Sequence, residues 1–338
     1  MDILITPYSH KLFPVLALIL IAAACTAPAA PMPALTPTTL PTSTPLPAST
    51  LAPTSIPNDL TYEQAVHLFD YSTDIPFEIK EISATQDEDG VTVYDIIYTA
   101  HDPEYGSGKG WTVAYLVRPA GEGPFAGILF MHWLGGGITR AEFLDEAKLL
   151  ARQGVVSLLI NGTFPWGKRP HDGESDRQQV IEQVIELRRA IDFLIAQPDV
   201  DPQRLAYVGH DYGGIYGGVL SGVEKRIKAY VLMTAPGNFS DWSIDYFLPK
   251  STDEALYREQ MAVVEPMLYI PHANPAALLF QFSSSDNFVP EEDAQEFFDT
   301  ASSPKEIKWY YTSHRLDLAA QTDRIAWLTT QLDLLPVR

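Results

Sequence analysis

The sequence contains 338 residues, enough for one large α/β domain or two small ones. Its 43 acidic and 23 basic residues give a formal net charge of −20. A surface this acidic argues against a nucleic-acid partner and against electrostatic binding to anionic lipid.

The N-terminal residues have the pattern of an export signal. Residues 12–24 form a short apolar segment that follows Lys11 and ends in small residues before Cys25, the single cysteine of the sequence. The segment is too short to span a membrane comfortably and has the length of a signal-peptide core. It resembles a bacterial lipoprotein signal. That resemblance implies that residues 1–24 are a cleaved signal peptide and that Cys25 is lipidated, so the protein is exported and anchored to the outer face of the cell membrane. An ordinary cleaved signal with an incidental cysteine is the alternative.

A low-complexity segment separates this signal from the rest of the chain. Residues 26–57 are almost entirely Pro, Thr, Ala, Ser and Leu. Such a composition cannot bury a core and favours extended, polyproline-like conformations. We therefore expect residues 25–57 to be a lipid-anchored spacer in front of a folded domain at 58–338, with membrane contact only through the lipidated N-terminus.

The folded domain begins with a helical pattern and extended segments and continues with alternating strands and helices. Strands that alternate with helices of this length predict a mostly parallel central sheet flanked by helices, preceded here by antiparallel strands. Residues 236–275 are rich in Tyr, Trp and Phe and are the candidate for a small lid. The first helix is predicted at 62–71 and the first strands at 77–83, 91–100 and 111–118; later strands at 125–131, 155–160, 205–208, 227–234, 277–282 and 307–311; later helices at 141–153, 180–196, 291–301 and 315–334.

The segment LAYVGHDYGGIYGG, at residues 205–218, predicts the turn on which the site depends. Its apolar run ends at Gly209, and Asp211 is followed two residues later by Gly213. This is the G-x-Nuc-x-G pattern of a nucleophile elbow, a sharp turn between a buried strand and a helix. The turn strains the backbone of the central residue, so nothing larger than glycine is expected to fit on either side of it. The usual occupant is serine, and here it is aspartate.

A candidate acid and base follow the elbow in the order that such sites use. Asp286 comes after the strand predicted at 277–282, and His314 comes after the strand predicted at 307–311. His314 would accept a proton from the attacking group or water, and Asp286 would fix its tautomer. A single strand-end aspartate is more often a helix cap, but the ordered pair supports a triad. His210, next to the elbow residue, is expected to be structural.

A glycine-rich loop after the buried strand at 125–131 is the candidate oxyanion hole. Residues 130–137 read FMHWLGGG, close to an H-G-x-G pattern. The amide N–H groups of Leu134 and Tyr212 are predicted to converge on a developing negative charge. Trp133 stands where glycine is expected, so it either reshapes the hole or contributes an indole N–H for a leaving group.

Three further residues are candidates for substrate contact: His132, Trp166 and Tyr246. No metal or phosphate motif is present, so no cofactor is expected. The expected partner is therefore a small-molecule substrate.

The residues from 111 to 334 resemble a bacterial α/β hydrolase of the dienelactone-hydrolase and acyl-esterase type, through PDVDPQRLAYVGHDYGG, KRIKAYVLMTAP and FQFSSSDNFVP. Antiparallel strands ahead of βα units are also the order of the α/β-hydrolase fold. In that group the elbow carries serine or cysteine. The G-H-D-x-G-G elbow is similar instead to haloalkane dehalogenases and epoxide hydrolases, whose nucleophile is aspartate. The resemblance implies a hydrolase with Asp211, His314 and Asp286 as triad, acting on an alkyl halide, an epoxide, or an ester or lactone.

The aspartate changes the chemistry that is expected. A carboxylate, with a reference pKa of about 3.9, is ionised at neutral pH and needs no base to activate it. Attack on an alkyl carbon gives an ordinary ester that activated water can hydrolyse, whereas attack on an ester carbonyl gives a mixed anhydride, a poor intermediate. Displacement at carbon is therefore favoured, and Asp211 acting as a water-directing base is a variant. The alternatives are a degenerate relative that binds a ligand without turnover, or a structural domain.

Overall fold

The computed structural model describes residues 56–105, 109–135, 139–164 and 172–335. These belong to the compact unit Ser55–Arg338. The predictions for the signal peptide, for Cys25 and for Trp166 fall outside the described residues, as does nearly all of the expected spacer. They stay predictions.

The described strands form one nine-stranded, mostly parallel sheet in the order β1-β2-β3-β5-β4-β6-β7-β8-β9. Pairing is antiparallel from β1 to β5 and parallel from there to β9. Antiparallel strands at one edge and parallel strands elsewhere are the predicted arrangement. The strands are β1 (Lys80–Gln86), β2 (Thr92–Thr99), β3 (Trp111–Arg118), β4 (Phe125–Met131), β5 (Val155–Ile160), β6 (Val200–His210), β7 (Ala229–Met233), β8 (Ala277–Ser283) and β9 (Lys305–Tyr310).

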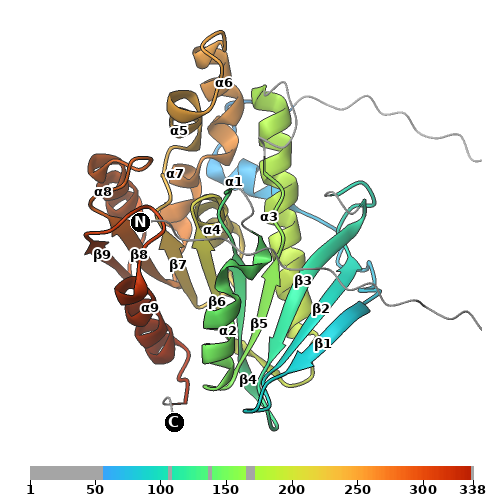
Figure 1. Ribbon diagram of the computed structural model, residues 1–338. Helices are drawn as coiled ribbons and strands as arrows, with labels where there is room; N and C mark the ends of the chain where they lie inside the picture. Colours follow the sequence, from blue (N-terminus) through green and yellow to red (C-terminus); the bar gives the residue numbers. More distant parts are fainter. Residues whose placement is uncertain (1–55, 106–108, 136–138, 165–171, 336–338) are drawn as a thin grey trace, which may run out of the picture. The chain divides into compact units, whose positions relative to one another are not determined.

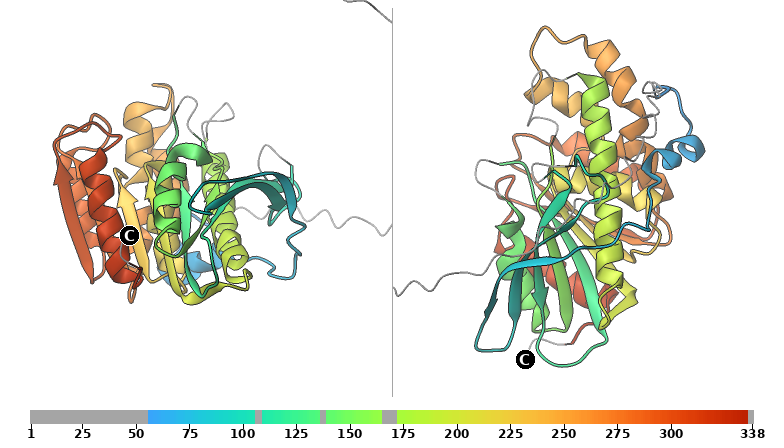
Figure 2. Two further views of the ribbon diagram at one scale, coloured as in Figure 1. Left: turned by 60° about the horizontal axis from the view of Figure 1, so that its bottom comes forward. Right: turned by 90° about the vertical axis from the view of Figure 1, so that its right-hand side faces the viewer.

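Helices cover both faces of this sheet, as Figures 1 and 2 show. One buried apolar cluster packs α3 and α4 against the sheet, and a second packs α2 and α9 against the opposite face. Because both faces are covered, β4 and β5 are buried along their whole length and read as continuous apolar runs. The α-helices are α1 (Tyr62–Ala65), α2 (Leu144–Ala151), α3 (Gly173–Ile195), α4 (Tyr212–Val223), α5 (Phe239–Tyr246), α6 (Glu254–Met261), α7 (Pro266–Tyr269), α8 (Glu291–Thr300) and α9 (Leu318–Gln331); the 3₁₀ helices are η1 (Val66–Phe69), η2 (Arg140–Phe143), η4 (Ala262–Val264) and η5 (Ile270–His272).

Several predicted bounds are wrong, and the capping residues give the reason. Helix α3 begins seven residues earlier than the apolar periodicity indicates, because Asp172 caps it by accepting the N–H of Ser175. Its first turns are polar on the outside and pack on α6, where the hydroxyl of Tyr257 donates to Asp176 at 2.8 Å. Helix α9 begins later than predicted, at Leu318, because Asp317 caps it. The first helix is shorter than predicted, and β1 lies three residues further along the chain than 77–83.

The segment predicted as a lid is helical. It comprises α5, α6, η4, α7 and η5. Figure 1 shows α5 and α6 farther from the sheet than α7, next to α3. Glu265, the residue before α7, connects it to α5. Its carboxylate accepts the N–H groups of Phe239 and Ser240, at 2.5 and 2.9 Å, at the first turn of α5. Movement of this segment as a lid stays a prediction.

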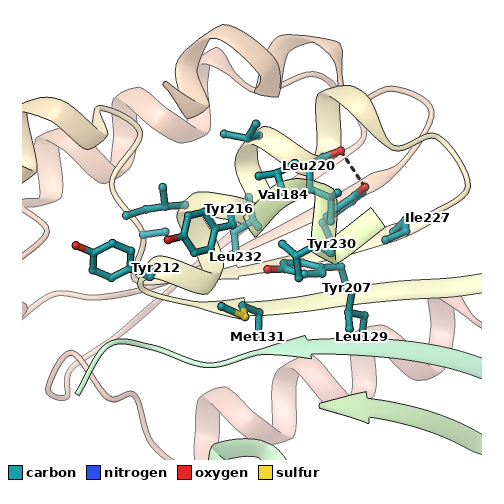
Figure 3. Packing of buried hydrophobic residues seen from close by; sticks show 14 of the residues in the cluster. Leu129, Met131, Val184, Tyr207, Tyr212, Tyr216, Leu220, Ile227, Tyr230 and Leu232 are labelled. Carbon is teal, nitrogen blue, oxygen red and sulfur yellow. Dashed lines mark hydrogen bonds between the residues drawn. The ribbon is translucent and has the colours of Figure 1, made fainter. Parts of the chain in front are cut away.

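A group of buried tyrosines fills the space between α4 and the sheet (Figure 3). Three of their hydroxyls have a backbone acceptor: Tyr207 donates to Gly213 O at 2.7 Å, Tyr216 to Thr163 O at 3.0 Å, and Tyr230 to Glu224 O at 3.1 Å. Burial without a hydrogen bond would cost each phenol the desolvation of its hydroxyl, so these contacts permit an aromatic core. The bond from Tyr207 ties the elbow strand to the first turn of α4.

Candidate active site

The elbow has the geometry that its glycines predict. Asp211 lies between β6 and α4 with φ +54° and ψ −112°, a strained conformation for a residue with a side chain. A Cβ on Gly209 would lie 2.2 Å from Gly213 O, and a Cβ on Gly213 would lie 2.2 Å from Met131 O. The prediction that only glycine fits on either side of Asp211 is confirmed.

The structure brings Asp211, His314 and Asp286 together at the carboxyl ends of β6, β9 and β8. His314 Nδ1 lies 2.8 Å from Asp286 Oδ2, and His314 Nε2 lies 3.7 Å from Asp211 Oδ1. Asp286 is oriented in turn by the amide N–H groups of Phe288 and Val289, which donate to its Oδ1 at 2.8 and 3.3 Å. The imidazole therefore lies between two carboxylates, in the order acid, base, elbow residue.

This position changes the charge state of His314. Burial lowers the pKa of its imidazole, but the two carboxylates, Asp211 first and then Asp286, outweigh burial and raise it to about 9. At neutral pH His314 is therefore a cation between two anions, and in this state it cannot take a proton from water.

The two carboxylate oxygens of Asp211 have different surroundings. Oδ2 accepts the amide N–H of Leu134 at 3.2 Å, the donor that sequence predicts for the oxyanion hole. Oδ1 is buried and, among the described residues, has no hydrogen-bond partner within range. Tyr212, the other predicted donor, is the first residue of α4, and its ring packs among aromatic side chains. The site thus holds one oxygen of Asp211 and leaves the other directed at His314.

The elbow residue borders a small cavity of about 80 Å³. Sequence reasoning misses three aromatic residues of its wall: Trp242, Phe247 and Phe288. The first two belong to the segment predicted as a lid, so its aromatic content was the available signal; nothing local marks Phe288. The lining residues are Trp133, Leu134, Asp211, Tyr212, Trp242, Phe247, Phe288 and His314.

The predicted substrate-binding residues have different positions. His132 is buried, its Nδ1 donates to Trp133 O at 2.8 Å, and its Nε2 accepts the N–H of Gly162 at 3.0 Å. Both nitrogens are therefore used by the backbone, and substrate contact by His132 stays a prediction. Tyr246 is 40% exposed and packs on Phe288, which places it next to the cavity wall and leaves its role a prediction.

Trp133 does not donate its backbone N–H to the oxyanion site. That N–H donates to Glu142 Oε2 at 3.0 Å, while the indole packs on His210 with ring centroids 5.3 Å apart. His210 is fully buried and bonded through its ring, as expected of a structural histidine. Glu142 is missed by sequence reasoning, because a glutamate at the start of a helix gives no signal of what lies opposite it.

Within the described ranges, no three His, Cys, Asp or Glu side chains are grouped to hold a metal ion. None of the helices traced in those ranges combines the length and apolar character needed to cross a bilayer.

Comparison with known proteins places the fold. No protein-family profile matches the chain. The uncharacterised peptidase YuxL of Bacillus subtilis is 24% identical over 249 residues, which are 66% of this chain and 36% of that protein, so the chain spans about a third of its relative. Acetyl xylan esterase 1 from Thermoanaerobacterium sp. JW/SL YS485 superposes with a TM-score of 0.65 at 14% identity, covering 80% of this chain and 93% of the esterase. The acetyl xylan esterase from Paenibacillus sp. R4 gives 0.63 at 17% identity with the same coverages. Together with the sheet order and the elbow, these similarities show that the chain has the α/β-hydrolase fold.

Proposed function

We propose that the protein is a hydrolase in which Asp211 attacks an alkyl carbon of a small electrophile and His314 then directs hydrolysis of the resulting ester. The observation that supports this most is that the two oxygens of the Asp211 carboxylate have different hydrogen-bond surroundings. Leu134 holds Oδ2, while Oδ1 accepts no hydrogen bond from the residues that the structure describes and is paired with the His314 imidazole at 3.7 Å. An anionic oxygen without hydrogen bonds is a better nucleophile than a solvated one, because no donor must be displaced for attack.

The reaction balances as the addition of water across one bond. The lone pair of Oδ1 forms a C–O bond as the carbon–halogen or epoxide C–O bond breaks, and the leaving group departs with the bonding electrons. His314 first gives up its proton, to solvent or to the alkoxide that epoxide opening leaves. Water then gives a proton to the neutral imidazole as its oxygen attacks the ester carbonyl carbon of Asp211. The developing oxyanion is Oδ2, which already accepts the N–H of Leu134. The protonated His314 gives that proton to the departing alkoxide, so the product leaves as an alcohol and the carboxylate is restored.

Electrostatics place the two steps in order. While Asp211 is charged, its carboxylate and that of Asp286 keep His314 protonated, since they raise its pKa to about 9. Alkylation of Asp211 makes a neutral ester and removes the larger of these two contributions. The pKa of His314 then falls, and the imidazole becomes a base only when there is an ester to hydrolyse.

Two tryptophans are available to stabilise a leaving group. Trp133 and Trp242 both line the cavity. Their indole Nε1 atoms are buried and, in the part of the chain that the structure describes, neither has a hydrogen-bond partner. A buried donor left without an acceptor costs free energy, so a side-chain adjustment that lets a departing anion accept from one of these groups would offset that cost. This favours a halide or alkoxide leaving group in the aromatic wall.

The size and lining of the cavity limit the substrate. A volume of about 80 Å³ is roughly half that of an engineered apolar cavity that holds benzene, so the reacting end has only a few non-hydrogen atoms. Its wall is mainly aromatic, which favours an uncharged alkyl group.

Hydrolysis of an ester by acyl transfer fits this site less well. An ester substrate would need a donor for its carbonyl oxygen, and the Leu134 amide already serves Asp211. The same observation supports the second candidate, a serine hydrolase that has lost its nucleophile and binds a small ligand without turnover. The esterases of similar fold act on esters by their names, but at 14 and 17% identity they support only the fold.

Trapping the alkyl-enzyme separates the two candidates. The variant His314→Gln, incubated with haloalkanes and epoxides of two to four carbons, is expected to gain the mass of one alkyl group on the peptide that contains Asp211. His101→Gln is the matched control, because His101 also pairs with a buried carboxylate but does not line the cavity, and it should accumulate no adduct. Adducts absent from His314→Gln with every electrophile, together with ester hydrolysis gained in Asp211→Ser, would favour the binding protein.

A further inference from the structure

A buried glutamate–histidine pair lies beneath the candidate triad and has no part in the reaction proposed above. His210 ends β6 and is fully buried, and Glu142 belongs to η2. His210 Nδ1 lies 2.5 Å from Glu142 Oε1. The imidazole is stacked on the Trp133 indole, with the ring planes 11° apart, so the pair sits directly under the loop that follows β4.

The glutamate holds the loop that carries the oxyanion donor. Its second oxygen, Oε2, accepts the backbone N–H of Trp133 at 3.0 Å. The next amide along the chain, that of Leu134, donates to Asp211. Burial raises the pKa of Glu142, but the charge and hydrogen bond of His210 and the N–H of Trp133 outweigh it, and the net direction is down. Glu142 is therefore an anion that fixes the peptide next to the oxyanion donor.

The histidine holds the loop that carries the base. His210 Nε2 lies 3.2 Å from the backbone carbonyl of His314, and the hydroxyl of Thr234 donates to that same oxygen at 3.2 Å. Thr234 has φ +42°, which is unusual for a β-branched residue. Leu316, two residues after His314 in the chain, has φ +59°. A strained backbone at both positions persists only where surrounding contacts fix it.

We propose that Glu142 and His210 are positioning residues: one buried ion pair holds the Leu134 amide and the His314 imidazole at a fixed separation across Asp211. Both nitrogens of His210 face acceptors, so both contacts are hydrogen bonds only when both nitrogens carry protons. The assignment of these residues to catalysis rests on the proposed function, whereas the doubly protonated ion pair does not. Loss of the pair would shift both loops, and a displacement of about 1 Å costs about 100-fold in rate.

Kinetics of variants test the positioning role. Glu142→Gln keeps the size of the side chain and an acceptor for Trp133 but removes the charge that pairs with His210. We expect single-turnover rates of alkylation and of ester hydrolysis to fall by about 100-fold, with KM changed less than about threefold. The matched control is Glu186→Gln, which breaks a second buried glutamate–histidine pair, with His101 at 2.9 Å, outside the cavity lining. Equal rates in the two variants, at equal loss of melting temperature, would overturn the proposal.

Nitrogen-15 NMR of the imidazoles tests the ion pair in the protein without substrate. In the wild type at neutral pH, both ring nitrogens of His210 are expected to carry slowly exchanging protons. In His210→Phe, which keeps an aromatic ring under Trp133, the His314 signals are expected to shift, and in Glu186→Gln they are not. A neutral His210 in the wild type would overturn the proposal, even if Glu142→Gln fails to fold. A doubly protonated His210 in a protein that forms no adduct would instead refute the proposed function and leave the pair established.

Discussion

At the scale of single residues, the proposed mechanism uses the one carboxylate of Asp211 both as the nucleophile and as the oxyanion of the later step. Oδ1 faces His314, and Oδ2 accepts the amide of Leu134. A serine at the elbow would leave that amide free for the carbonyl oxygen of a substrate. With aspartate in place of serine, the Leu134 amide therefore donates to the elbow side chain and not to a substrate oxygen.

Replacing this carboxylate should change the titration of His314. In Asp211→Asn the first of the two contributions that raise the pKa of His314 is lost, so the pKa is expected to fall from about 9 by about one unit or more. NMR titration of the imidazole measures it. The control is Asp317→Asn, which removes a carboxylate that is close to His314 in the sequence and caps α9. The pKa of His314 should be unchanged in this variant. A pKa unchanged in Asp211→Asn would mean that the charge of Asp211 does not act on His314.

The sign of the pH dependence follows from the same pair. Because the pKa of His314 is raised from 6.5 to about 9 on folding, its ion pairs contribute stability that is fully present below pH 6.5. That contribution is lost as the pH rises through about 9. The wild type should therefore lose stability across this window, and Asp211→Asn should lose less.

Residue identity was predictable from sequence where chain order decides it. Asp211, Asp286 and His314 each follow a strand, and the fold brings these strand ends to one edge of the sheet, so their proximity was predictable, whereas their roles as nucleophile, acid and base stay predictions. Glu142 and Phe288 were not predictable, because no local pattern records which side chains meet across loops. The backbone contacts of His132 were not predictable either, because a histidine in a glycine-rich loop does not record which backbone groups it will meet.

At the scale of elements, α5 brings Trp242 to the cavity, and Glu265 fixes where α5 begins. Burial raises the pKa of Glu265 to about 7, and the N–H groups of Ser240 and Phe239 only partly offset that effect. The first turn of α5 accepts a negative charge favourably, yet the fully buried carboxylate remains costly to ionise. Helix α5, which carries Trp242 of the cavity wall, is therefore held at its first turn by Glu265, a carboxyl group whose pKa is about 7.

The stability of the protein should report this titration. A carboxyl whose pKa is raised from 4.5 to about 7 binds its proton more tightly in the folded state, so its contribution is fully present below pH 4.5 and is lost as pH rises through about 7. Relative to Glu265→Gln, the wild type should lose about 3 kcal/mol of unfolding free energy over this range. Urea unfolding at several pH values measures it. Glu296→Gln, on the exposed face of α8, should show no such difference, and parallel curves for wild type and Glu265→Gln would contradict the assignment.

Element boundaries were less predictable than element type. The apolar periodicity of α3 begins where the helix reaches the sheet, but Asp172 starts the helix earlier and its first turns pack on α6. Strand β1 is exposed along its length, so its sequence has no buried face to fix its bounds. Buried strands such as β4 and β5 match their predicted bounds because their apolar runs end where burial ends.

At the scale of the whole molecule, the order of strands and helices predicts the fold. Antiparallel strands followed by βα units give the nine-stranded sheet, and the helices between the parallel strands cover both of its faces. The same topology brings the loops after β4, β6, β8 and β9 to one edge, where the candidate site lies. Fold alone does not choose between acyl transfer, alkyl transfer and binding, because that choice depends on the one residue at the elbow.

Oxygen-18 labelling tests most directly whether Asp211 is the nucleophile. In one turnover in oxygen-18 water, with an electrophile that alkylates His314→Gln, water attacks the ester carbonyl, so the label should enter the Asp211 carboxylate and the first alcohol released should be unlabelled. Mass spectrometry of the peptide that contains Asp211 and of the product measures both. Label in the first alcohol and none in Asp211 would mean that water attacks the substrate directly, and the covalent mechanism would be wrong.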